Sequence, residues 1–249
     1  MEFAFNHIYE YREMLLAGAL MTLKLTALSV LIGTVIGLIG ALMRLARADK
    51  GNIAVRFIAW LMRTLSMLYV NFFRGTPLFV QVMIWFNVWF LFFVNQTDGL
   101  FVSGDAANEL RRTSGPLIAG ILALSANSGA YITEIFRAGI QSIDKGQMEA
   151  ARSLGLSYMQ AMRYVIVPQA FRRMLPPLGN EFITLLKDSS LLSVISTPEL
   201  TYVAKTIQGR YPSFKEPYYT IAAIYLLMTV TIVWLLSLLE KRFNKAQHR

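Results

Sequence analysis

The sequence predicts an all-α integral membrane protein that crosses the bilayer five times. Apolar residues make up 55% of the 249 residues, charged residues only 16%, and the mean hydropathy is +0.46, values that soluble domains seldom reach. Charge-free windows close to the length that crosses a bilayer occupy residues 25–43, 75–97, 116–133 and 217–239. These windows give four clear spans, and a further span, interrupted by charged residues, is expected at about residues 171–194.

In chain order the expected spans are residues 15–43, 54–95, 116–139, 171–194 and 217–240. Fifteen of the 24 Lys and Arg residues lie in, or at the span ends next to, the segments that follow the first, third and last spans, against six in the other connections. Because positively charged connections stay in the cytoplasm, we expect the N-terminus outside and the C-terminus inside. The loop at 141–168 is then cytoplasmic and the loop at 96–115 lies outside. Residues 1–249 are expected to form one transmembrane domain.

Several classes of function are excluded by residues that the chain lacks. It has no cysteine, and its two histidines, His7 and His248, lie near opposite ends, so neither a metal cluster nor a Ser-His-acid triad can form. No Gly-x-x-x-x-Gly-Lys-Ser/Thr loop is present to hold ATP. The net charge is +9, but the Lys and Arg residues are spread between the spans, as the expected membrane topology explains. They form no basic face interleaved with aromatic residues of the kind that binds nucleic acid. We therefore expect neither an enzyme nor a nucleic-acid-binding protein, and no bound cofactor or metal.

The second span is expected to break at Arg74, Gly75 and Thr76, next to Pro77. Proline lacks an amide donor and restricts the residue before it, so a helix is interrupted there. A break at membrane depth often lines a substrate path in transporters, whereas a turn at the membrane surface needs no such role. Both interpretations are open, and Arg74 is accordingly either an interfacial anchor or a partner for a carboxylate.

Polar residues of the third span share one face of a helix. Asn127, Tyr131 and Glu134 lie at positions i, i+4 and i+7. Exposing Glu134 to lipid costs several kcal/mol, so we expect it to face a water-filled path or the bundle interior. The alternative is a Glu134 at the membrane interface, paired with Arg137 three residues later.

The fourth span carries the charges that make it the least apolar. Lys187, Asp188, Ser189 and Ser190 offer donors and acceptors within one helical turn. A zwitterionic ligand needs donors for its carboxylate and acceptors for its ammonium group, so these residues suit an amino acid. The alternative is an internal or intersubunit ion pair between Lys187 and Asp188.

Within the loop at 141–168, two short helices are expected to form a compact knob. Gly146 and Gly155 are natural breakpoints, and Ser157 with Gln160 has the pattern of a capping box that starts a second helix. Pro168 is expected to end that helix. A rigid cytoplasmic knob fixed between spans can transmit force from a docked partner, whereas an amphipathic helix lying on lipid is the alternative.

The same loop resembles the coupling loop of ABC importer permeases. Glu149-Ala150-Ala151, then Gly155, then Val165-Ile166-Val167-Pro168 have the spacing of that family's motif. Four further segments resemble its polar amino acid branch, the histidine/glutamine/glutamate/arginine type: Phe73-Arg74-Gly75-Thr76-Pro77, Glu134-Ile135-Phe136-Arg137-Ala138-Gly139-Ile140, Pro168-Gln169-Ala170 and Leu186-Lys187-Asp188-Ser189-Ser190-Leu191. The resemblance implies the type I ABC importer permease fold and a multi-pass protein of the bacterial inner membrane.

The resemblance also implies partners and site residues. Two permease chains, identical or related, would face a pair of ATPase subunits that bind ATP and Mg²⁺, and an extracytoplasmic solute-binding protein would deliver the amino acid. The ATPase contact would be made by Glu149, Ala150, Ala151, Gly155, Leu156 and Ser157. The substrate path would include Arg74, Gly75, Thr76, Asn127, Tyr131, Glu134, Lys187, Asp188, Ser189 and Ser190. Acidic, amide and basic amino acids all remain open as substrates.

Two other functions remain as alternatives. In an ion-coupled secondary transporter, Glu134 or Asp188 would titrate and no nucleotide would be needed. A membrane anchor for a cytoplasmic partner would use the knob alone, but it leaves Glu181, Lys187 and Asp188 without a role.

Overall fold

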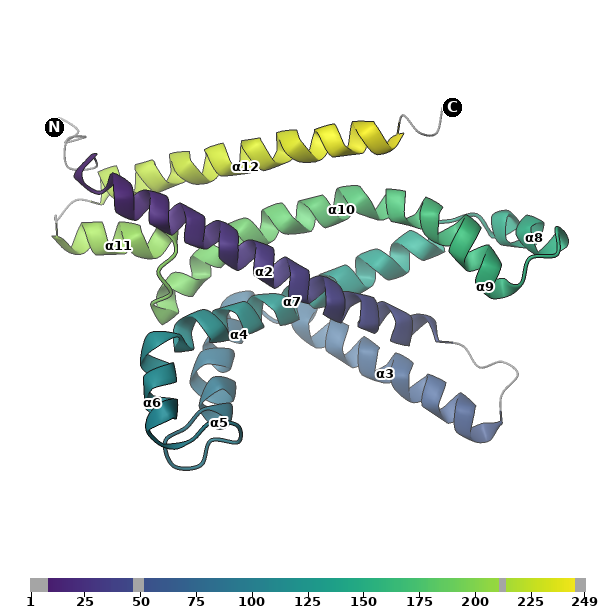
Figure 1. The fold of residues 1–249 in the computed structure, drawn as a ribbon, viewed down its shortest axis with the longest axis horizontal. Helices are drawn as coiled ribbons and strands as arrows, with labels where there is room; N and C mark the ends of the chain where they lie inside the picture. The colour runs from purple at the N-terminus through teal and green to yellow at the C-terminus, as the bar shows by residue number, and fades with distance from the viewer. Residues whose placement is uncertain (1–8, 47–51, 211–213, 245–249) are drawn as a thin grey trace.

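The computed structural model describes residues 9–46, 52–210 and 214–244, and the fold over these residues is helical (Figure 1). The long helices are α2 (Arg12–Leu45), α3 (Ile53–Gly75), α7 (Gly115–Gln141), α10 (Val167–Asp188) and α12 (Lys215–Asn244). The shorter helices are α4 (Leu78–Ile84), α5 (Phe90–Phe93), α6 (Gly104–Thr113), α8 (Lys145–Ser153), α9 (Tyr158–Ala161) and α11 (Leu200–Arg210). Two π-helical turns, Trp85–Trp89 and Met162–Ile166, and the 3₁₀ helix Ser189–Ile195 complete the helical segments described.

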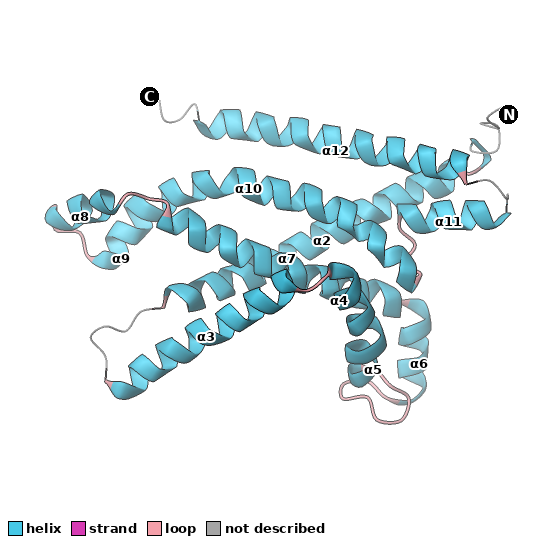
Figure 2. Ribbon diagram, turned by 180° about the vertical axis from the view of Figure 1, so that it is seen from behind, coloured by secondary structure: helices cyan, strands magenta, loops and turns pink. Residues whose placement is uncertain are grey.

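Helices α2 and α7 cross at the centre of the molecule (Figures 1 and 2). Glycines of α2 allow this contact, because a Cβ atom at Gly37 would lie 2.6 Å from Cγ2 of Ile132, and one at Gly40 would lie 2.4 Å from Oγ1 of Thr133. Small residues let two helix backbones approach closely. The most apolar stretch of α7 is accordingly 67% buried, whereas that of α12 is 6% buried.

Four of the described helices, α2, α3, α7 and α12, are long and apolar enough to cross a membrane. The charge-free window at 75–97 does not form one of them. Instead α3, which precedes it, is the long helix, and the chain after Pro77 forms a shorter apolar helix over Leu78–Phe93. Physically, Pro77 interrupts the helix, so the apolar window starts a new element there.

Helix α10 has 22 residues but is not among the four. Five charged side chains lower its hydropathy: Arg172, Arg173, Glu181, Lys187 and Asp188. The chain continues past Asp188 as the 3₁₀ helix.

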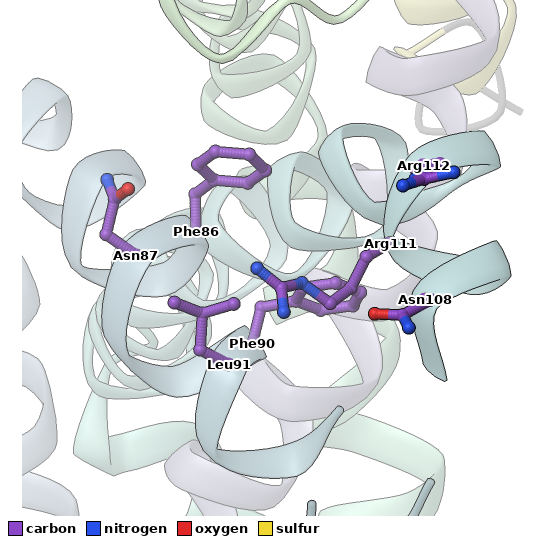
Figure 3. Close-up of a pocket in the computed structure, with 7 residues that line it drawn as sticks. All are labelled: Phe86, Asn87, Phe90, Leu91, Asn108, Arg111 and Arg112. Carbon is purple, nitrogen blue, oxygen red and sulfur yellow. The ribbon is translucent and has the colours of Figure 1, made fainter. Parts of the chain in front are cut away.

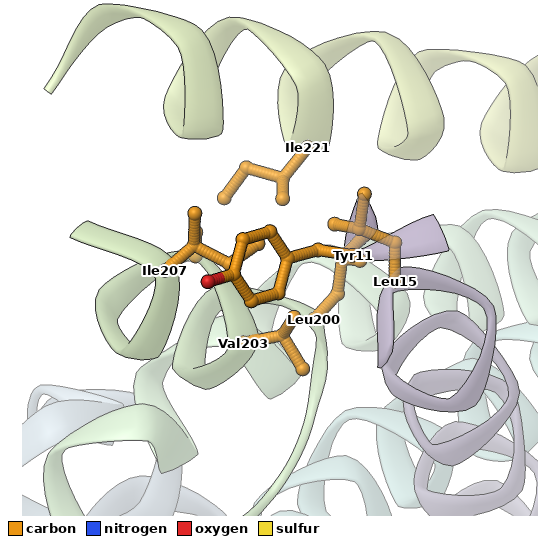
Figure 4. Packing of buried hydrophobic residues seen from close by; sticks show 7 residues of the cluster. Tyr11, Leu15, Leu200, Val203, Ile207 and Ile221 are labelled. Atoms are coloured by element: carbon orange, nitrogen blue, oxygen red, sulfur yellow. The ribbon is translucent and has the colours of Figure 1, made fainter. Parts of the chain in front are cut away.

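A small apolar cluster joins the beginning of α2 to the end of the chain. Tyr11 and Leu15 pack against Leu200 and Val203 of α11 and against Ile221 of α12 (Figure 4). This cluster attaches one end of α12 to the rest of the protein, and α12 also packs against α10, where Leu236 lies next to Gly179.

The expected end of the second knob helix at Pro168 is wrong. Helix α9 continues through the π-helical turn Met162–Ile166 directly into α10, and Pro168 lies in the first turn of that helix. In the π-helical turn the Val167 amide bonds to the Met162 carbonyl, five residues back. The first turn of a helix tolerates proline because its amide has no intrahelical partner to lose.

Candidate functional site

The knob between α7 and α10 consists of α8, a tight turn and α9 (Figure 1). Oδ1 of Asp144 accepts a hydrogen bond from the Gly146 amide at 2.6 Å and caps α8. Gly155 has φ +87°, and a Cβ atom added there would meet nothing within 4 Å, so it is the left-handed turn itself that requires glycine. The capping box predicted at Ser157 and Gln160 is present.

The knob is tied to the body of the protein at its base. Nε2 of Gln169 on α10 donates to Oε1 of Gln147 on α8 at 3.1 Å, and a guanidinium nitrogen of Arg173 donates to the Ser142 carbonyl. Beside these bonds lies an apolar cluster of Ile143, Ile166, Ala170 and Met174. The knob is therefore held from both sides, by α7 and by α10.

The residues expected at the ATPase contact differ in their exposure. Glu149, Ala150, Gly155 and Ser157 are exposed, and Leu156 is half-buried. Ala151 is only 4% exposed and packs inside the knob. Leu154, which the motif does not single out, is 84% exposed in the turn.

The backbone break between α3 and α4 is closed by hydrogen bonds from one buried side chain. Nε2 of Gln81 donates to the carbonyls of Phe73 and Thr76, at 2.8 and 3.0 Å, and to Oγ1 of Thr76 at 2.8 Å. Oε1 of Gln81 accepts from Nδ2 of Asn127 on α7, at 2.9 Å. The Asn127 side chain thus holds α7 against the break between α3 and α4. Gly75 has open space around it.

Three of the predicted path residues line one cavity of about 430 Å³. Arg74 comes from the end of α3, and Tyr131 and Glu134 come from α7. The Arg74 guanidinium carbon lies 5.1 Å from the centre of the Tyr131 ring. Arg173 and Pro177 of α10 contribute a further wall.

Glu134 is the carboxylate of this cavity and is surrounded by arginines. Nε of Arg137 donates to its Oε2 at 2.9 Å, and a second nitrogen of Arg137 contacts Oε1. Arg44 of α2 lies 3.8 Å from Oε2. Glu134 therefore both lines the cavity and pairs with Arg137, which combines the two interpretations of this residue.

The polar residues at the end of α10 do not line this cavity. Lys187 is exposed, Asp188 and Ser190 are half-buried, and Ser189 is buried with its hydroxyl donating to the Leu186 carbonyl at 2.7 Å. Across the described residues, no ion pair within 4 Å joins Lys187 to Asp188. The two expected parts of the substrate path are therefore separate in this structure.

A second hollow, of about 370 Å³, lies between α6 and the segment formed by the π-helical turn Trp85–Trp89 and α5. Figure 3 shows the Arg111 side chain extending over Phe90 and Leu91, with Asn108 beside it. Asn108, Arg111 and Arg112 belong to the expected outer loop, whereas Phe86, Asn87, Phe90 and Leu91 belong to the end of the second expected span.

Sequence reasoning missed three functional or structural side chains. Gln81 is a lone amide in an apolar run four residues after Pro77, and that isolation is its only signal. Arg173 reaches the cavity from α10. Glu199 is fully buried and accepts hydrogen bonds from the amides of Thr201 and Tyr202, at 2.8 and 2.7 Å, and from the Tyr225 hydroxyl at 2.9 Å. Burial raises the pKa of the Glu199 carboxyl above its ordinary value.

Comparison with curated proteins gives relatives that match nearly the whole of this chain. The chain is 36% identical over 244 residues to the glutamine transport system permease protein GlnP of Escherichia coli (strain K12), covering 98% of this chain and 99% of that protein. It is 35% identical to the glutamate/aspartate import permease protein GltK of Escherichia coli O6:H1, over 97% and 98% of the two chains. The arginine transport system permease protein ArgU of Corynebacterium glutamicum is 35% identical, with 97% of this chain and 72% of that protein covered.

Solved structures agree with these relatives. The crystal structure of an amino acid ABC transporter with histidines has a chain that is 41% identical, with a TM-score of 0.77 over 97% of this chain and all of the other. A chain of the MetNI methionine ABC transporter, in an inward-facing conformation, is 26% identical with a TM-score of 0.65, over 94% and 95% of the two chains. The resemblance to ABC importer permeases is confirmed. Residues 33–245 match one protein family, and the chain therefore belongs to the binding-protein-dependent transport system inner membrane components.

Proposed function

We propose that this chain is the permease subunit of an ATP-driven importer of polar amino acids in the bacterial inner membrane. Its relatives are permeases named for glutamine, glutamate/aspartate and arginine. The ion-coupled alternative receives no support from them. In this proposal the chain crosses the membrane five times, with α10 as the fourth span in chain order, the N-terminus outside and the C-terminus in the cytoplasm.

The knob is proposed to dock on a separate ATPase subunit that binds ATP and Mg²⁺. The single observation that carries this step is the exposed turn around Gly155, which is held to both α7 and α10 at its base. Glu149, Ala150, Gly155, Leu156 and Ser157 would form the contact, with Ala151 supporting it from inside. Closure of two ATPases would draw two knobs together and turn two permease chains between inward-facing and outward-facing states. A second permease chain, identical or related, completes the path.

The substrate path is proposed to have an inner and a second polar region. At the inner region, Arg74, Tyr131 and Glu134 line the 430 Å³ cavity, whose arginines suit a carboxylate. The second region is Lys187, Asp188, Ser189 and Ser190, where the 3₁₀ helix contacts α4 just after the break at Gly75 and Thr76. A solute-binding protein on the outer side would supply the amino acid, and the choice among side chains is shared between it and this path.

The docking step is tested by Gly155→Trp and Glu149→Arg in the complex purified through this chain. We expect both variants to lose most of the co-purifying ATPase, because the first obstructs the turn and the second reverses the charge at the contact. The measurements are the amount of ATPase subunit retained and the ATP-dependent uptake of labelled glutamine, glutamate and arginine into proteoliposomes.

Matched controls lie at the other end of the protein. Gly104, like Gly155, has a positive φ, +71°, and open space around it, so Gly104→Trp imposes a similar backbone strain. Glu109→Arg reverses a charge on exposed helix α6. Retained ATPase and normal uptake in the two knob variants would refute the docking assignment.

A further inference from the structure

An apolar groove of about 710 Å³ lies beside the knob, on the side of α7 away from the charged cavity. Its walls come from the end of α2, the end of α7, α9 with the following π-helical turn, and the start of α10. Leu42 and Phe171 line it from α2 and α10, and Met159 lines it from the knob. The volume lies within the range of about 300–1,000 Å³ that ligand sites occupy.

The groove is open over the described residues, and several of its large apolar side chains are exposed. Leu42 is 59% exposed, Met159 72% and Phe171 46%. Large apolar side chains exposed together normally mark a surface covered by lipid or by a partner. Helix α2 is long and apolar enough to cross a membrane, so in the proposed orientation the part of the groove lined by Leu42 would lie beside the cytoplasmic leaflet.

The mouth of the groove has the chemistry of the membrane interface. Arg163 is the charged residue among those that line it, and its guanidinium carbon lies 5.6 Å from the Tyr164 ring. Tyr158 and Tyr164 are exposed on the same segment, at 61% and 64%. Tyrosines of this kind lie at the headgroup level, and arginine pairs with phosphate there. The groove thus has an apolar interior and one cation at its entrance.

We propose that this groove binds one anionic phospholipid of the cytoplasmic leaflet, with an acyl chain among Leu42, Met159 and Phe171 and the phosphate at Arg163. The proposal rests on the cytoplasmic placement of the knob in the proposed function. A single acyl chain and a single anionic headgroup match the two chemistries present. Because Met159 belongs to α9 and Leu42 to α2, the bound lipid would fill the space between the knob and the first span.

The test uses the complete complex, reconstituted in vesicles that contain equal amounts of phosphatidylglycerol and phosphatidylcholine. The retained lipids are counted per permease chain by native mass spectrometry. We expect the wild type to retain phosphatidylglycerol about fivefold over phosphatidylcholine, the factor that roughly one arginine near an anionic headgroup supplies. Arg163→Gln is expected to abolish this preference. Arg172→Gln, which removes the same charge from the same helical segment but outside the groove, is expected to keep it.

A second pair of variants tests the apolar interior. Leu42→Trp fills the groove and is expected to lower the retained lipid severalfold, whereas Leu31→Trp, on an equally exposed position of α2 outside the groove, is expected to leave it unchanged. Equal retention of the two lipids by the wild type, or unchanged retention in Leu42→Trp, would overturn the proposal. Loss of a protein subunit instead of lipid in Leu42→Trp would also overturn it, because a protein would then cover the groove.

Failure of this inference and failure of the proposed function give different results in the same preparations. If the wild type retains the two lipids equally while the ATPase stays bound, only the proposed lipid site is contradicted. An ATPase that stays bound in Gly155→Trp, with lipid retention as expected, contradicts the docking assignment alone.

Discussion

The last turns of α7 separate two hollows of opposite chemistry. Tyr131, Glu134 and Ala138 line the charged cavity of about 430 Å³, whereas Phe136 and Ile140 line the apolar groove of about 710 Å³. Residues three and four apart share one face of a helix, so these two sets point in different directions. One helix of 27 residues thus divides a charged cavity from an apolar groove. The chemistry of each hollow is set by a few positions rather than by the helix as a whole.

The largest expected effect comes from moving α2, which lines the groove and contacts the carboxylate of the charged cavity. Helix α2 supplies Leu42 to the groove and Arg44 to Glu134, and its position depends on Gly37. Gly37→Ala places a methyl group 2.6 Å from Ile132, and overpacking costs about 1–3 kcal/mol. We expect the unfolding temperature of the complex to fall by roughly 3–10 °C, measured by tryptophan fluorescence.

The control for this change is Gly209→Ala in α11, where nothing lies within 4 Å of the added methyl group. There we expect no loss of stability, because alanine favours a helix over glycine. Equal unfolding temperatures for wild type and Gly37→Ala would mean that the α2–α7 contact accommodates the methyl group without loss of stability, which would contradict the prediction.

An intermediate effect is expected from the charged cavity alone. Glu134→Gln leaves Arg137 and Arg44 without their carboxylate, although the pair is one quarter exposed and water screens it. We expect the uptake rate in proteoliposomes to fall by roughly two- to fivefold, and the lipid retained in the groove to stay constant. Glu109→Gln on α6 serves as the control. A changed lipid count with normal uptake would show that the two hollows are not independent.

The smallest effect is expected at Glu199, a carboxylate outside both hollows. Its partners are neutral donors, unlike the arginines around Glu134. Because burial raises its pKa, the folded protein binds this proton more tightly than the unfolded chain. Stability is therefore expected to fall as pH rises from about 4.3, the ordinary glutamate pKa, through the raised value. In thermal unfolding measured between acidic and neutral pH, we expect Glu199→Gln to reduce the change of stability with pH. An unchanged slope would mean that other groups cause the pH dependence.

Local features of the site could be predicted from the sequence, whereas contacts between distant segments could not. The turn at Gly155 and the Ser157–Gln160 capping box each depend only on residues close together in the sequence, and the structure contains both. The Gln81–Asn127 bond joins residues 46 apart, so only the packing of α4 against α7 creates it. The helix end predicted at Pro168 is wrong because a π-helical turn, which has no clear sequence pattern, carries the chain past it.

The substrate path shows the same limit. The helical stripe predicts that Tyr131 and Glu134 share a face, and both line the same cavity. It does not predict that Arg173 of α10 joins them there, because charge alone does not say which helix faces which. The apolar groove cannot be predicted from the sequence for a related reason, since several distant segments contribute to its lining and none is unusual alone.

The cavity around Glu134 has more positive than negative charge. Arg74 and Arg173 line it, Arg44 and Arg137 flank its carboxylate, and no second acidic side chain is part of its described lining. Fixed positive charge in a narrow passage raises the energy of any cation that enters, as arginines do in channels that exclude protons. We expect Arg74→Gln with Arg173→Gln to increase potassium leakage from loaded proteoliposomes, and unchanged leakage would contradict this. The arginines that suit a substrate carboxylate would then also keep the passage insulated between turnovers, so that the membrane potential is not discharged through the transporter.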